Sequence, residues 1–106
     1  MPKIKSEYND LDKYNYSDGG ISYYKKNTEV CHNPYGPAII GIHGEVEYWI
    51  EGKLHRLDGP AVIRPNNKIW PNGKIQYYIN GKKIDEEQFQ IEVLKYTNKE
   101  YLMPLL

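Results

Sequence analysis

The sequence predicts a mainly β fold, a curved antiparallel β-meander of short hairpin repeats that ends in one amphipathic helix. The first observation is a phrase used twice, VCHNPYGPAII at residues 30–40 and EGKLHRLDGPAVI at residues 51–63, in which Gly36 and Gly59 lie 23 positions apart. The second is an adjacent aromatic pair followed by a polar or glycine-containing turn, which begins at Tyr23, at Tyr48 and at Tyr77. A period in the twenties is typical of a hairpin unit that buries its apolar face only against neighbouring copies.

The chain has 106 residues, which suits one domain with one core. Residues 1–20 are a polar lead-in, irregular or short-stranded, that closes in the turn sequence SDGG. The β-repeat region follows at residues 21–84, the helix at 85–97 and a tail at 98–106. The tail ends in the apolar sequence YLMPLL, which we expect either to dock back or to present a contact.

About six short antiparallel strands are expected in the repeat region, joined by tight turns. Alternation of side chains and apolar segments after each Gly-Pro predict strands at residues 38–42, 45–51, 61–64 and 74–79. The pairs Asn72-Gly73 and Asn80-Gly81 are strong hairpin signals, and Gly52 tolerates a positive φ after Glu51.

The segment DEEQFQIEVLKY predicts one helix over residues 86–96. Asp85 is a suitable N-cap, and Gln88 stands three positions later in capping-box register. Phe89, Val93 and Tyr96 recur at helical spacing with Leu94 alongside, so one face is apolar. We expect this helix to cover the open face or the end of the sheet rather than to bind a partner.

Composition and charge exclude several classes of protein. Lys plus Arg and Asp plus Glu both total 14, so long-range attraction to nucleic acid or to an anionic membrane is disfavoured. A single cysteine, Cys31, cannot form an internal disulfide, which fits a reducing compartment. No apolar window approaches the length of a membrane span, and a cytoplasmic location is expected.

Three segments together resemble a known repeat: EGKLHRLDGPAVI, PNGKIQYYINGKKI and GPAII. They are similar to a MORN-like repeat variant of the type NGK-LHR-DGPA, met in proteins of large DNA viruses, phages and some bacteria. The resemblance covers roughly residues 21–85. The first copy has Asn-Pro-Tyr in place of Arg-Leu-Asp, and the third stops at Ile84-Asp85. It implies a curved antiparallel meander used as an interaction surface and brings no catalytic chemistry.

His55, Arg56 and Asp58 crowd one turn, where a carboxylate beside a basic group either fixes the turn or forms an acid/base pair. The sequence Asp58-Gly59-Pro60 is typical of a turn. We therefore expect a structural role for five residues of this segment, which are His55, Arg56, Asp58, Gly59 and Pro60. The first copy keeps His32 but lacks the acid, which weakens a catalytic pair further.

No cofactor or metal is expected. Cys31, His32, His43 and His55 are the only soft or imidazole ligands, and their spacing matches no zinc motif. No serine or threonine has a neighbouring base or glycine-rich elbow to activate it, and no phosphate-binding loop is present.

The aromatic residues are the remaining binding candidates, because tyrosine suits wet contact surfaces and the chain has 11 of them against one phenylalanine. Neighbours in a strand point to opposite faces, so each aromatic pair places one ring on each face of the sheet. We expect the exposed row to be Tyr24, Trp49 and Tyr78, called here the aromatic row. The mirror choice is Tyr23, Tyr48 and Tyr77, called here the tyrosine row.

The leading hypothesis is a non-enzymatic protein-interaction module, an accessory protein of a virus or phage that binds or inhibits a host protein through an exposed aromatic face. The alternative is a binder of a small ligand, glycan or nucleotide that uses the same face. An enzyme based on His55 and Asp58 ranks third.

Overall fold

The structure is a computed structural model that describes residues 3–5 and 9–97. These residues form ten strands and one helix. The strands are β1 (Lys3–Lys5), β2 (Leu11–Asn15), β3 (Ile21–Lys25), β4 (Ile39–Ile40), β5 (Val46–Glu47), β6 (Trp49–Ile50), β7 (Lys53–Leu54), β8 (Val62–Arg64), β9 (Lys74–Ile79) and β10 (Lys82–Ile84), and the helix is α1 (Glu86–Thr97).

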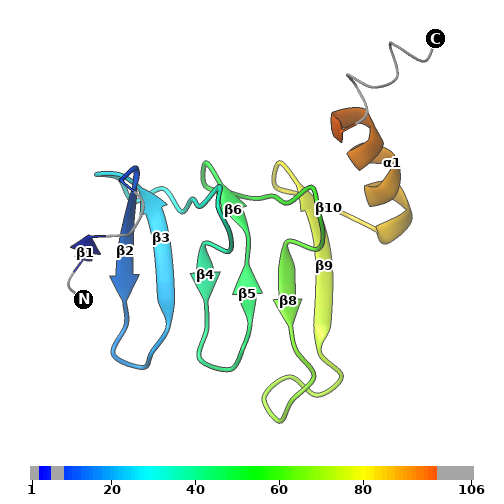
Figure 1. Ribbon diagram of the computed structural model, residues 1–106. Helices are drawn as coiled ribbons and strands as arrows, with labels where there is room; N and C mark the ends of the chain where they lie inside the picture. The colour runs from blue at the N-terminus through cyan, green and yellow to red at the C-terminus, as the bar shows by residue number, and fades with distance from the viewer. Residues whose placement is uncertain (1–2, 6–8, 98–106) are drawn as a thin grey trace.

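The strands lie side by side in a single antiparallel layer (Figure 1). Their order is β1-β2-β3-β4-β5-β8-β9-β10, and β6 and β7 form a small hairpin above β5 and β8. The first three residues of β9 pair with β8, whereas its last three pair with β10. The predicted mainly β, antiparallel architecture with one C-terminal helix is therefore confirmed.

Each repeat is built on one long arm with two successive partners. In the first two repeats the lower part of the arm pairs with the strand that follows the next Gly-Pro, and in all three repeats the upper part folds back through a tight turn. In two of these turns the first residue is left-handed, Glu51 with φ 51° and Asn80 with φ 50°, and each is followed by a glycine with positive φ. Two such residues match the right-handed twist of the strands that they join.

The predicted strands occur at their expected places: β9 spans all of residues 74–79 as predicted, whereas the strands predicted at 38–42, 45–51 and 61–64 are shorter than expected. The expected strand at 45–51 is divided at Tyr48 into β5 and β6, because its two halves pair with different neighbours. The lead-in, expected to be irregular or short-stranded, forms β1 and β2, and β2 pairs with β3 along its whole length. The repeat region holds eight strands, β3 to β10, instead of the expected six or so, and β1 and β2 of the lead-in bring the described residues to ten.

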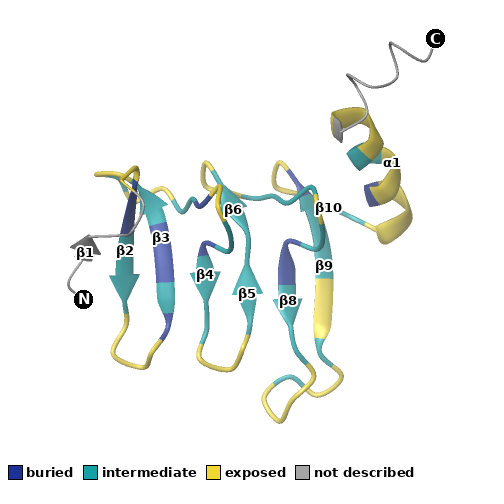
Figure 2. Cartoon of the chain, in the orientation of Figure 1, coloured by how far each residue is buried: buried dark blue, intermediate teal, exposed yellow. Residues whose placement is uncertain are grey.

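The core is thin because the sheet has no second layer within the described chain. Its buried apolar residues come from every part of the sheet and from the helix: Leu11, Tyr23, Ala38, Ala61, Val62, Ile79 and Phe89. Most other strand residues are half-buried (Figure 2). The radius of gyration is 15.8 Å, with extents of 53 × 37 × 19 Å. A compact domain of this length has a radius of gyration of about 13 Å.

The helix lies beyond the end of the sheet and packs against β9 (Figure 1). Its cap is the predicted one, since Oδ1 of Asp85 accepts the backbone N–H of Gln88 at 2.7 Å. The Gln88 side chain donates to Glu92. Phe89 is buried, whereas Leu94 and Tyr96 are about half exposed, so the apolar face is covered only in part. No helix in the described part of the chain is long and apolar enough to cross a membrane. The tail at 98–106 lies outside the described residues.

Candidate functional site

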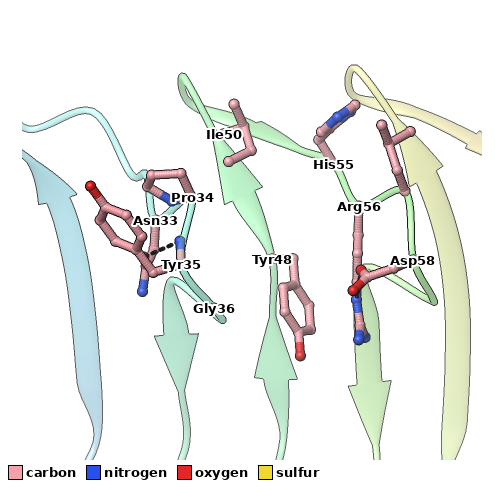
Figure 3. A pocket seen from close by; sticks show the side chains of 10 residues that line it. Asn33, Pro34, Tyr35, Gly36, Tyr48, Ile50, His55, Arg56 and Asp58 are labelled. Atoms are coloured by element: carbon pink, nitrogen blue, oxygen red, sulfur yellow. Dashed lines mark hydrogen bonds and ion pairs between the residues drawn. The ribbon is translucent and has the colours of Figure 1, made fainter. Parts of the chain in front are cut away.

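A hollow lies between two equivalent turns, the first at residues 33–36 and the second at residues 55–58. The volume of this hollow is about 350 Å³. Figure 3 shows that Tyr48 lies between the two turns, with Asn33 and Tyr35 on one side and Arg56 and Asp58 on the other. The predicted residues His55, Arg56 and Asp58 thus lie together at one wall of this hollow.

Arg56 holds the second turn in shape. Its Nε donates to Oδ1 of Asp58 at 2.8 Å, and its Nη1 donates to the carbonyl oxygen of Pro60 at 3.1 Å. Its guanidinium also lies over the Tyr48 ring, with Cζ 4.0 Å from the ring centroid. The hydrogen bond from Arg56 lowers the pKa of Asp58, so this carboxylate stays ionised at neutral pH. These contacts fix the turn, because Arg56 binds both the Asp58 carboxylate and the backbone.

Asn33 fixes the shape of the first turn, where the sequence has Asn-Pro-Tyr in place of Arg-Leu-Asp. Its Nδ2 donates to the carbonyl oxygen of Pro37 at 3.0 Å, as Arg56 does to Pro60. Its Oδ1 accepts the backbone N–H of Tyr35 at 2.9 Å. The Asn-Pro-Tyr sequence is therefore a structural substitute for Arg-Leu-Asp. Sequence reasoning missed this role, although the 23-residue alignment places Asn33 opposite Arg56.

The repeated histidines join each repeat to the next. Nδ1 of His32 accepts the backbone N–H of Glu51, and Nδ1 of His55 accepts that of Asn80, both at 2.9 Å. Glu51 and Asn80 are the first residues of successive hairpin turns. Burial lowers the pKa of His55, which favours the neutral ring that this acceptor role requires. Nδ1 of His55 thus has a structural partner in the next repeat.

The Gly-Pro-Ala phrase supplies a small residue that bonds to the strands on both sides. The carbonyl oxygen of Ala61 accepts the N–H of Tyr48 at 2.8 Å, while its N–H donates to the carbonyl oxygen of Gln76 at 2.9 Å. Ala38 bonds in the same way to Tyr23 and Glu47. Both alanines have no exposed surface, so a larger side chain has no space there.

Gly59 does not have a backbone conformation that requires glycine. Its φ does not lie in the left-handed region, which among the described glycines is occupied by Gly19, Gly44, Gly52, Gly73 and Gly81. A Cβ on Gly59 would instead lie 2.9 Å from Cζ of Arg56. The glycine thus makes room for the arginine that fixes the turn.

The aromatic row, Tyr24, Trp49 and Tyr78, lies on one face at equivalent positions of the three long arms. All three side chains are half-buried. The indole N–H of Trp49 donates to Oε1 of Glu47 at 2.8 Å, and the Tyr24 ring lies 5.1 Å from that of Tyr14. These contacts hold the rings in place and leave part of each accessible.

The tyrosine row lies on the opposite face, where each ring contacts a different side chain, and Tyr48 and Tyr77 are half-buried like the residues of the aromatic row. Tyr23 is buried and lies near the ammonium group of Lys13. Tyr48 lies under Arg56, and the Tyr77 ring contacts that of Phe89 at 4.6 Å. Burial and the Glu86 carboxylate raise the pKa of Tyr77.

Cys31 lies between the arms and offers no reactive thiolate. Burial raises the pKa of its thiol to about 11, and the Glu47 carboxylate adds to the shift. Among the residues that the structure describes, no three His, Cys, Asp or Glu side chains form a group that could hold a metal ion.

No protein-family model, no curated protein and no solved structure matches the chain.

Proposed function

We propose that the chain is a non-enzymatic protein-interaction module that binds another protein through the aromatic row. The observation that carries this proposal is the single-layer sheet. Three aromatic side chains recur at equivalent positions on one face, and each is half-buried with no described element layered over it. Ordered, partly accessible aromatic side chains are the usual anchors of protein interfaces.

The chemistry of the second turn supports the same conclusion. His55, Arg56 and Asp58 each have a structural partner in the turn or in the neighbouring repeat. The resemblance to MORN-like repeats of viruses and phages supports a host protein as the partner. The proposed role is that of an accessory protein that binds or inhibits this partner.

The test compares the two rows. Alanine would replace Tyr24, Trp49 and Tyr78 one at a time, and Tyr23, Tyr48 and Tyr77 in a matched set. Binding to a purified partner, first captured from host lysate, would be measured together with the thermal melt. We expect aromatic-row variants to stay folded and to lose roughly 2 kcal/mol of binding free energy, about 30-fold in Kd.

The tyrosine-row variants are expected to lose stability. Equal melting losses in both rows, with no selective loss of binding, would place the interface elsewhere on the chain.

A small polar ligand is the second candidate, because the hollow between the two turns carries an arginine and two tyrosines. A glycan or nucleotide that binds there should raise the melting temperature in proportion to the logarithm of its concentration. Arg56→Lys, which removes the planar group over Tyr48, should abolish that rise. A ligand panel that gives no concentration-dependent rise removes this candidate.

A further inference from the structure

The three long arms carry the same short pattern at the level where they pair with the next strand. The sequences are ISY at residues 21–23, VEY at 46–48 and IQY at 75–77. The first is paired by AII at residues 38–40 and the second by AVI at residues 61–63. In both pairs the tyrosine N–H donates to the alanine carbonyl, at 2.7 Å for Tyr23 and 2.8 Å for Tyr48.

The third arm has no such partner in the described chain. Strand β9 pairs over residues 74–76 with β8 on one side only. After β10 the sequence continues with the helix cap Asp85, where the earlier repeats continue toward Gly-Pro-Ala. Figure 1 shows the helix above this level, and the lower half of β9 is exposed in Figure 2.

The exposure of one side chain reflects the missing strand. Ile21 and Val46 are half-buried, whereas the equivalent Ile75 is 57 % exposed. Ile40 stands opposite Ile21, and Ile63 stands opposite Val46. Ile75 stands opposite Ile63 on its inner side and, among the residues that the structure describes, has no corresponding aliphatic neighbour paired on its outer side.

The backbone of Ile75 is directed to this open edge. The carbonyl of Gln76 faces inward, because it accepts the N–H of Ala61. Adjacent residues of a strand direct their backbone groups to opposite sides, so the N–H and C=O of Ile75 face outward. Such an unpaired edge is a template for another strand.

The occupied junctions define what fits the empty one. At each of them the partner is antiparallel and reads alanine, a β-branched aliphatic residue and isoleucine after Gly-Pro. The helix limits the space at the level of Tyr77 through Phe89, so the accessible stretch is short, like the two-residue and three-residue strands β4 and β8.

We propose that the outer edge of β9 at residues 74–76 binds an extended protein segment of the type Gly-Pro-Ala followed by two branched aliphatic residues, as an antiparallel strand. The inference goes beyond the proposed function, because it assigns a second binding surface at the edge of the sheet and names the kind of segment that this edge takes. Main-chain hydrogen bonds to Ile75 supply the pairing, and aliphatic contact with its side chain supplies the preference.

The probe is a fluorescent peptide with the chain's own sequence at residues 55–64, HRLDGPAVIR. We expect it to bind the full chain with a Kd below about 1 mM, and to shift the amide resonance of Ile75. Ile75→Pro removes the outward N–H at an edge position where proline is tolerated, and it should weaken binding at least about tenfold. Ile75→Val keeps the N–H and should bind like the wild type.

A second probe covers the case in which Ile75→Pro does not fold. The same peptide with an N-methyl group on its isoleucine cannot donate to Ile75, and it should lose binding to the unchanged protein. Absence of binding by the unmodified peptide, or equal binding of the N-methylated one, overturns the proposal. Equal binding by a folded Ile75→Pro variant overturns it as well.

Three further outcomes separate this inference from its alternatives. A wild-type dimer that Ile75→Pro converts to a monomer, with no peptide binding, would assign the edge to a second copy and overturn the proposal. Undiminished partner capture by Ile75→Pro, lost in Trp49→Ala, would overturn the edge inference while leaving the aromatic row intact. Capture lost only in the edge variant would support the edge and count against the row.

Discussion

At the scale of single residues, the positions of the repeated motif either make structural hydrogen bonds or hold a small residue where the backbone needs space. The histidine nitrogen accepts from the next turn, and the arginine or asparagine side chain fixes its own turn. Alanine bonds to two strands at once where nothing larger fits. The side-chain hydrogen bonds of the histidine and of the arginine or asparagine can each be removed by one substitution.

His55 should make the stability of the fold depend on pH. Its pKa is lowered by burial below the ordinary value near 6.5, so the unfolded chain takes up the proton first as pH falls. The free energy of unfolding should therefore be greatest above about pH 6.5 and decrease below it. Denaturant unfolding at pH 7.5 and pH 5.5 would measure the change.

The matched variants are His55→Asn and His55→Ala. Asparagine places an amide oxygen near the position of Nδ1 and does not titrate, so it should keep most of the stability and reduce the pH dependence. Alanine leaves the N–H of Asn80 without its acceptor and should cost about 1 kcal/mol at pH 7.5. A full pH dependence in both variants would show that other groups cause it.

The two equivalent glycines should respond differently to alanine. A Cβ on Gly59 displaces the guanidinium of Arg56, whereas a Cβ on Gly36 meets no heavy atom within 4 Å. We expect Gly59→Ala to lower the free energy of unfolding by about 1 kcal/mol and Gly36→Ala to change it by less than about 0.5 kcal/mol. Urea unfolding of both variants checks this.

The Arg56→Ala background provides the control. With the arginine already shortened, Gly59→Ala should cost nothing further, because the side chain it displaces is gone. An undiminished cost in that background would mean that the backbone of the turn, and not Arg56, requires glycine.

At the scale of elements, local sequence predicted what depends on local chemistry. The Asn-Gly turns and the Asp85 cap were predicted because their signals lie within a few residues. The division of the arm at Tyr48 was not, since it arises from pairing with two different strands. Within the lead-in, β2 pairs with the neighbouring strand β3 across the turn at residues 16–20, and its polar composition does not indicate this pairing.

For the site too, the sequence could predict contacts within one turn but not contacts between repeats. The 23-residue alignment could have identified Asn33 as the counterpart of Arg56. It could not show that His32 and His55 accept from Glu51 and Asn80, which are 19 and 25 residues further along the chain. Those distances differ because the repeats differ in loop length, so only the fold brings the partners together.

The helix should depend on one side chain for its place against the sheet. Phe89 is 4 % exposed and contacts the ring of Tyr77, while a 12-residue helix is marginal on its own in water. We expect Phe89→Ala to reduce the helical signal in far-ultraviolet circular dichroism and to leave the strand signal in place. Leu94→Ala, at a residue 53 % exposed, is the control and should change neither. An unchanged helical signal in Phe89→Ala would show that other contacts hold α1.

At the scale of the whole molecule, the single layer makes each strand depend mainly on its two neighbours. Stability in such arrays is close to a sum of unit and junction contributions. The two buried alanines are the junction residues, since Ala38 joins the first arm to the second and Ala61 joins the second to the third. Damage at one junction should therefore remain local.

Ala38→Leu and Ala61→Leu test this property as a pair. Both sites have no exposed surface, so the added carbons must separate the strands that the alanine joins, at a cost of about 1 to 3 kcal/mol. We expect Ala61→Leu to reduce hydrogen-exchange protection in β9 and α1 while β2 and β3 keep theirs, because the second junction lies between these parts. Ala38→Leu should reduce protection in β2 and β3 and leave β9 protected. The same uniform loss in both variants would contradict this pattern and mean that the sheet unfolds as one cooperative unit, with the junctions too strongly coupled for any arm to persist without its neighbour.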